Sequence, residues 1–152
     1  LTDPLADAER DVAEKGEAIV AGQQGQGFAQ NAAQRRAIEG LAMSRAKRHF
    51  SKLYSKVEDV SAVQCYDLRC SAPGRPPLKV EVKGTTGEGD TVFLTKNEVA
   101  LAKKGGCALF VLHSIKIAKN SATGGTPRIF RPWHVGRGRL EPMAYSYKVP
   151  KA

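Results

Sequence analysis

The sequence is poor in cysteine, in long apolar runs and in acidic residues. Its three cysteines stand at positions 65, 70 and 107, a spacing that matches no metal site and leaves one thiol without a disulfide partner. An odd set of thiols indicates a reducing compartment, so we expect a cytoplasmic location, or a nuclear one in a eukaryote. The longest apolar run, from Cys107 to Leu112, is far shorter than the roughly 20 residues of a membrane span. No membrane association is therefore expected.

The shortage of acidic residues is uneven along the chain. The sequence has 15 acidic and 24 basic residues, for a formal net charge of +9. Residues 1–30 contain six acidic and two basic residues, a net charge of −4, so the other 122 residues carry +13. A basic body of this kind favours a polyanionic partner, most simply nucleic acid. The alternative is a basic surface that only keeps the protein in solution.

The chain of 152 residues has the length of one domain. We expect an acidic N-terminal helix and a Gly/Gln linker over residues 1–30, followed by a single domain over residues 31–152. The chain begins with Leu rather than Met. It is therefore expected to belong to a larger protein with further domains or subunits, and a homodimer stays open.

The most informative stretch runs from Leu78 to Gly87. Read as a strand, it presents Val80 and Val82 on one face and Glu81 and Lys83 on the other, about 7 Å apart along the chain. Upstream, residues 65–70 alternate in the same way. If the two strands pair, Asp67 faces Glu81 and Lys83. Two converging carboxylates are a hard-oxygen site of the kind that Mg²⁺ prefers, and a lysine beside them can stabilise developing charge or position a water.

The rest of the chain reads as alternating helices and strands. A basic helix is predicted over residues 31–54. Strands are predicted over residues 57–63, 65–70, 78–83, 91–94 and 107–113, and a polar excursion over residues 120–126. Thr95 and Glu98 have the spacing of a capping box at the start of a second helix. We favour this local role for Glu98 over a catalytic one.

Several side chains are candidates for contacts with a nucleic-acid backbone. The loop over residues 84–90 directly follows the lysine, and its hydroxyls and backbone amides suit a phosphate. A loop that merely turns the chain is the alternative. The predicted nucleic-acid-binding residues are Arg35, Arg36, Thr85, Thr86 and Lys96.

Four blocks of sequence, in this order, resemble a known family: Arg36–Met43, Tyr66–Leu68, Val80–Thr86 and Leu94–Val99. They are similar to the DUF3883 group, also called the protein NO VEIN C-terminal domain, over about residues 35 to 119. An aspartate, thirteen further residues and then Glu-x-Lys on a hairpin after a helix also resemble the PD-(D/E)XK nuclease superfamily. The proline of that superfamily's motif is Tyr66 here, which is the form of the DUF3883 group.

The resemblance implies an α/β fold with an α-β-β-β-α-β core, in which helices flank a mixed central sheet. It also implies a Mg²⁺-dependent endonuclease acting on DNA, with Mn²⁺ able to substitute, as a module of a larger defence or nucleic-acid-processing protein. The alternative is a non-catalytic nucleic-acid-binding module, or a protein-interaction module of a larger ATPase.

The resemblance also assigns roles to individual residues. Asp67, Glu81 and the Val82 carbonyl would hold the metal. Lys83 would orient or deprotonate the attacking water. Glu39 on the first helix would support the metal through water, and an intrahelical pair with Arg35 or Arg36 is the alternative for this residue.

Overall fold

The computed structural model describes residues 32–142 and 147–150. The acidic helix and the linker predicted for residues 1–30 lie outside this part of the chain. The described elements are α2 (Ala32–Phe50), β1 (Lys56–Asp59), β2 (Leu68–Ser71), β3 (Leu78–Gly84), α3 (Lys96–Lys104), β4 (Cys107–Ala118), β5 (Ser121–Trp133) and the short 3₁₀ helix η1 (Val135–Arg137). Within the described residues, none of the helices combines the length and the apolar character that crossing a membrane requires.

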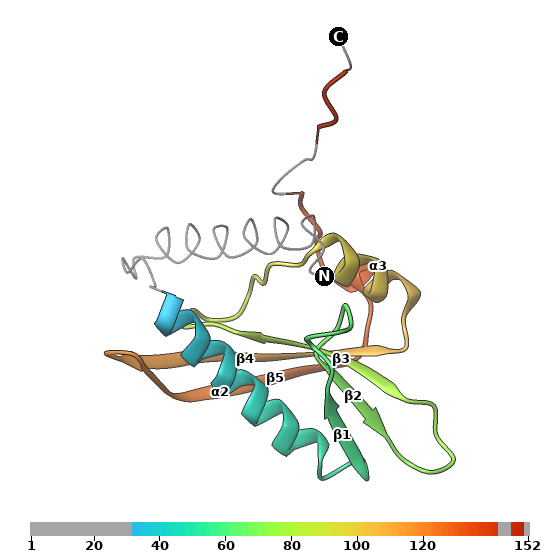
Figure 1. Ribbon diagram of the computed structural model, residues 1–152, viewed down its shortest axis with the longest axis horizontal. Coiled ribbons are helices and arrows are strands. Elements are labelled where there is room, and N and C mark those ends of the chain that lie inside the picture. The colour runs from blue at the N-terminus through green and yellow to red at the C-terminus, as the bar shows by residue number, and fades with distance from the viewer. Residues whose placement is uncertain (1–31, 143–146, 151–152) are drawn as a thin grey trace.

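The five strands form one sheet in the order β1-β2-β3-β4-β5. Neighbouring strands are antiparallel except for β3 and β4, which are parallel. A parallel pair needs a crossover connection, and α3 lies in that connection (Figure 1). The fold is therefore a mixed α/β fold, and its elements follow the predicted order with β5 added at the end.

α2 covers one face of the sheet. Its buried residues Ile38, Ala42, Ala46 and Phe50 recur every four positions, the spacing of one helix face. They pack against residues of β2, β3 and β4 that point to this side: Leu68, Cys70, Leu78, Val80, Ala108, Phe110 and Leu112. This apolar cluster is the larger of the two cores.

The end of β3 lies very close to α2. A Cβ atom added at Gly84 would come within 3.0 Å of the Ala42 Cβ and of the Ile38 carbonyl oxygen. Real Cβ atoms rarely come this close to other atoms, so the helix can lie at this distance because position 84 has no side chain.

α3 covers part of the opposite face. Leu101 and Ala102 of this helix belong to a second cluster of buried residues, which also contains Tyr66, Cys107, Leu109, Val111 and Trp133. Successive residues of a strand point to opposite faces. On β4 the even-numbered residues 108, 110 and 112 therefore pack under α2 and the odd-numbered residues 107, 109 and 111 under α3.

Two predicted strands are shorter than expected. β1 ends at Asp59 instead of residue 63, because the Asp59 carboxylate accepts hydrogen bonds from the Ser61 amide (3.2 Å) and hydroxyl (2.7 Å) and so turns the chain. The turn continues with a 2.8 Å bond from the Gln64 amide to the Val60 carbonyl. β2 consequently begins at Leu68 rather than at Cys65.

Two predictions beyond β3 were wrong. Residues 91–94 form no strand: they belong to the connection between β3 and α3, where Val92 and Leu94 pack against the second buried cluster. Residues 120–126 are not a polar excursion. All but Asn120 belong to β5, which pairs with a β4 that continues past His113 to Ala118. The long β4–β5 hairpin turns at Lys119 and Asn120.

Candidate active site

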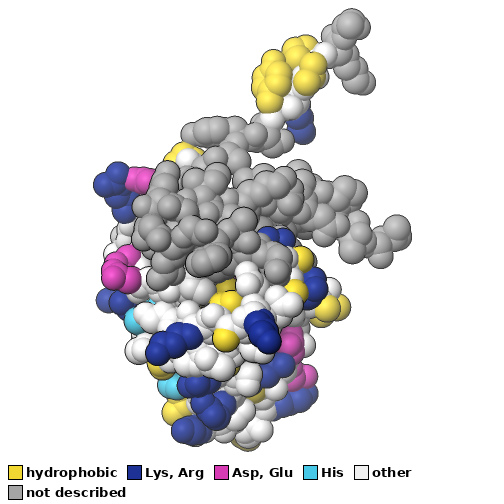
Figure 2. All heavy atoms as spheres, turned by 90° about the vertical axis from the view of Figure 1, so that its left-hand side faces the viewer, with side chains coloured by type: hydrophobic (Ala, Val, Ile, Leu, Met, Phe, Trp, Pro, Cys, Tyr) yellow, Lys and Arg dark blue, Asp and Glu magenta, His cyan; other side chains and the backbone are white. Residues whose placement is uncertain are grey.

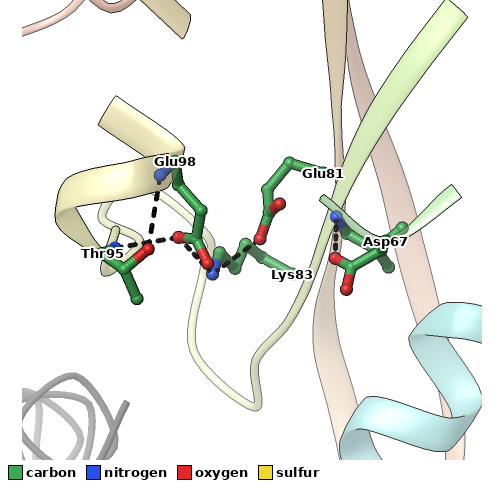
Figure 3. Close-up of polar contacts among 6 residues, drawn as sticks. Asp67, Glu81, Lys83, Thr95 and Glu98 are labelled. Carbon is green, nitrogen blue, oxygen red and sulfur yellow. Dashed lines mark hydrogen bonds and ion pairs between the residues drawn. The ribbon is translucent and has the colours of Figure 1, made fainter. Parts of the chain in front are cut away.

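β3 places Glu81 and Lys83 on the face that α3 covers (Figure 3). The Lys83 Nζ atom lies 3.0 Å from Oε1 of Glu81 and 3.0 Å from Oε2 of Glu98. The side chains are largely enclosed, with 17% of Lys83, 3% of Glu81 and 14% of Glu98 exposed. The predicted carboxylate–lysine pair is therefore present, with a second carboxylate on the same ammonium group.

That second carboxylate has two roles at once. Thr95 and Glu98 form the predicted capping box of α3. The Thr95 hydroxyl accepts a bond from the Glu98 amide (3.3 Å), and Oε2 of Glu98 accepts one from the Thr95 amide (2.9 Å). The same Oε2 atom also contacts Lys83. The capping box predicted the local role, but the ion pair with Lys83 has no local sequence signal.

Asp67 lies immediately before β2 and completes the row of polar side chains in Figure 3. Its amide donates to the Val80 carbonyl (3.0 Å), and its Oδ2 atom accepts a 2.8 Å bond from the Val82 amide. One carboxylate oxygen of Asp67 thus extends the hydrogen bonding between β2 and β3. The side chain is half-buried beside Glu81.

Two carboxylates contact the single ammonium group of this cluster, and the third, that of Asp67, interacts with it only through its charge. Burial raises the pKa of Glu81 well above its ordinary value, an effect that Lys83 opposes and that the charges of Asp67 and Glu98 reinforce. Burial also raises the pKa of Asp67, against the bond from Val82 and the charge of Lys83. For Lys83, burial favours the neutral amine, but Glu81 and Glu98 together outweigh it and raise the lysine pKa.

Three of the predicted phosphate contacts, Thr85, Thr86 and Lys96, lie close in sequence to members of this cluster. The Thr85 hydroxyl accepts a 3.1 Å bond from the Gly87 amide, and the Thr85 amide donates to the Leu112 carbonyl at 2.9 Å. Both groups therefore stabilise the loop itself. Thr86 is half-buried in the same loop, and Lys96 is exposed in the first turn of α3.

Arg35, Arg36 and Glu39 lie on α2, which covers the opposite face of the sheet from Glu81 and Lys83. Arg36 and Glu39 are exposed, and Arg35 is half-buried. The proposed roles of these residues, and of the Val82 carbonyl, stay predictions.

The donor set of the cluster fits a hard divalent cation in its chemistry. Asp67 and Glu81 each keep a carboxylate oxygen besides the one that accepts a bond from Val82 or Lys83. Carboxylate and carbonyl oxygens are what Mg²⁺ takes from proteins, usually one or two carboxylates with water and phosphate completing the shell. In the described part of the chain, no three His, Cys, Asp or Glu side chains are grouped so that they could hold a metal ion. Among these residues the candidate ligands are therefore the carboxylates of Asp67 and Glu81.

Comparison with protein families identifies a match over more than half of the chain. The family model described as protein NO VEIN, C-terminal, matches residues 38–123, which include Asp67, Glu81, Lys83 and Glu98. No match to the chain was found among curated proteins or among solved structures.

Proposed function

This chain belongs to the protein NO VEIN C-terminal family, and from that premise we propose that it is a metal-dependent nuclease domain that hydrolyses DNA phosphodiester bonds. The observation that supports this proposal is the enclosed cluster of Asp67, Glu81, Lys83 and Glu98, in which carboxylates outnumber the only ammonium group. The proposal places the domain within a larger defence or nucleic-acid-processing protein and assigns it to the PD-(D/E)XK nucleases.

In this proposal Asp67, Glu81 and the Val82 carbonyl hold Mg²⁺, or Mn²⁺ in its place. The ion would polarise the scissile phosphate and lower the pKa of a bound water. Asp67 is fixed by its 2.8 Å bond from the Val82 amide, and Glu81 by its 3.0 Å contact with Lys83. The chain thus holds both carboxylates in place through contacts that involve β3.

Lys83 would stabilise charge on the phosphate and orient the attacking water. An ammonium group has three N–H donors, and Glu81 and Glu98 together engage two of them. The third is free in this scheme to donate to a phosphate oxygen or to a water. Glu98 acts as a positioning residue, because it fixes Lys83 while its own carboxylate is held by the start of α3.

The direct test incubates the purified chain with plasmid and with single-stranded, duplex and base-modified DNA, in Mg²⁺ or Mn²⁺ and in chelator. We expect metal-dependent cleavage that falls by about 10²–10³ in Lys83→Gln, as for removal of a group that stabilises transition-state charge. Lys79→Gln is the matched control, since Lys79 is exposed on the same strand. Circular dichroism verifies that each variant is folded.

Metal binding is tested in the same samples. Mn²⁺ should raise the melting temperature of the wild type by mass action on the folded state, and Asp67→Asn should abolish this rise. A wild type that binds DNA without cleaving any substrate would instead favour the non-catalytic binding module.

A further inference from the structure

A pocket lies on the opposite side of the sheet from the candidate active site. It has a volume of about 190 Å³ and lies between the C-terminal half of α2 and the strands β4 and β5. The residues that line it are Arg45, Arg48, His49, Lys52, Phe110, Leu112 and Pro127. All four polar lining residues are therefore basic: Arg45, Arg48 and His49 lie in the last two turns of α2, and Lys52 lies in the turn that follows the helix.

The positive charge of this basic pocket is not neutralised within the described residues. No Asp or Glu side chain there forms an ion pair with Arg45, Arg48 or Lys52. The nearby carboxylate of Asp59 is paired with Lys47 at 2.9 Å. Arg45 donates instead to the Gly124 carbonyl at 3.3 Å. Figure 2 shows Lys and Arg side chains spread more widely than Asp and Glu over the described part of one face of the molecule.

A further cation stands next to the pocket. Arg131 of β5 donates to the Tyr54 hydroxyl and lies 5.2 Å from the centre of its ring. The pKa of the half-buried His49 ring is lowered, first by burial and then by the positive charges of Lys52 and Arg131. An anion in the pocket would reduce this accumulation of positive charge.

The floor of the pocket is apolar. Phe110 and Leu112 are almost completely buried, and the His49 ring packs edge-on against Phe50 at 4.9 Å. Apolar walls lower the local dielectric constant and strengthen the attraction between an anion and the cations at the rim. The volume is below the 300–1,000 Å³ typical of sites that enclose a whole small molecule. It suits a single phosphate group on a ligand that extends out of the pocket.

We propose that this basic pocket binds a phosphate group carried by a nucleotide or by a nucleic-acid strand, independently of the candidate active site. Arg48 and Lys52 would donate charge-assisted hydrogen bonds to the phosphate oxygens, with Arg45 and His49 at the sides. The pocket and the carboxylate cluster lie on opposite faces of the sheet. Binding here therefore does not depend on whether the chain cleaves DNA.

The test uses the full chain in chelator, so that metal at the carboxylates takes no part. Binding of a short fluorescein-labelled single-stranded oligonucleotide is measured by anisotropy over a range of salt concentrations. The pocket variant is Arg48→Gln/Lys52→Gln. The matched control is Lys103→Gln/Lys104→Gln, which removes the same charge from exposed positions in the last turn of α3.

We expect the pocket variant to bind about tenfold or more weakly than the control, since it loses two charge-assisted contacts. The slope of log affinity against log salt should fall by about 1 for each contact removed. Competition by a nucleoside monophosphate or by inorganic phosphate identifies a free phosphate ligand. Competition by unlabelled oligonucleotide alone identifies the strand as the source.

A second measurement locates the binding. The ring signals of His49 in NMR spectra should move when inorganic phosphate or oligonucleotide is added to the wild type, and should stay in place in the pocket variant. Equal affinities of the pocket and control variants, or equal His49 shifts in both, would overturn the proposal whatever the nuclease assay shows.

Discussion

On the α2 face of the sheet, β3 and β4 present Val80 and Phe110 to the helix, and the layer between them is apolar. On the α3 face the same strands present Glu81 and Lys83 beside Leu109, and the layer contains charges. The difference follows from the helix that covers each face. α2 brings alanines and packs closely, whereas the shorter α3 brings Glu98 and leaves room for an ion pair. Strand alternation thus lets one stretch of sequence form a core and a polar site back to back.

The comparison predicts that the largest loss of stability comes from the α2 face. Phe50 is completely buried and lies 6.3 Å, ring centre to ring centre, from Phe110. Phe50→Ala should lower the free energy of unfolding by about 3–5 kcal/mol, because it removes apolar contacts and leaves a cavity. Urea denaturation measures this loss. Leu53→Ala is the control, at a position that is 45% exposed. Similar losses in both variants would show that α2 does not cover the sheet as described.

On the α3 face, Glu98→Gln separates the two roles of that residue. The amide oxygen of the glutamine can still accept the bond from Thr95, so the cap stays. The negative charge that faces the Lys83 ammonium group is lost. We expect a loss of about 1.5–3 kcal/mol, as for a hydrogen bond to a charged group. Thr95→Ala, which weakens only the cap, should cost about 1 kcal/mol.

The pH dependence of this loss has a definite sign. The pKa of Lys83 is raised in the folded state: Glu81 and Glu98 outweigh the burial that lowers it. The contribution of Lys83 to the free energy of unfolding is therefore fully present below the ordinary lysine pKa of 10.5. It decreases as the pH rises through the folded-state pKa. Urea titrations of wild type and Glu98→Gln should converge at alkaline pH. A constant difference across the pH range would exclude the ion pair as its source.

The smallest effect is expected at the exposed edge between α2 and β1. Lys47 and Asp59 form a 2.9 Å ion pair with side chains 42% and 39% exposed. Lys47→Met should cost about 0.2–1 kcal/mol, the usual range for exposed pairs.

Salt and acid should both remove this small difference. High salt screens exposed charges. The pKa of Asp59 is lowered, chiefly by the hydrogen bond from Ser61 and then by Lys47. The contribution of Asp59 to the free energy of unfolding is therefore present above the ordinary pKa of 3.8. It is lost as the pH falls through the lowered, folded-state pKa. A difference that persists in molar salt would mean that Lys47 acts through packing.

The sequence predicted the features that depend on neighbouring residues. The helices and strands from α2 to β4 (apart from the extra strand predicted over residues 91–94), the capping box of α3 and the shared face of Glu81 and Lys83 follow from local sequence patterns. Beyond the pairing of β2 with β3, the sequence did not predict contacts between distant segments. Glu98 meets Lys83 across 15 positions, and the basic pocket needs β5 to pair beside β4. The absence of a strand over residues 91–94 likewise depends on a tertiary contact, since Val92 and Leu94 pack against the second buried cluster.

The glycine at the end of β3 has a consequence for how this family's sequences change with time. The close approach of α2 requires a glycine at position 84. Val80 and Val82 pack into the core beneath that helix, whereas Glu81 and Lys83 point to the opposite face of the sheet. The stretch Val-Glu-Val-Lys-Gly therefore consists of two interleaved sets of residues under separate structural constraints. A relative without the proposed chemistry could exchange the glutamate and the lysine and still keep the valines and the glycine. One set packs the fold, and the other carries the proposed chemistry.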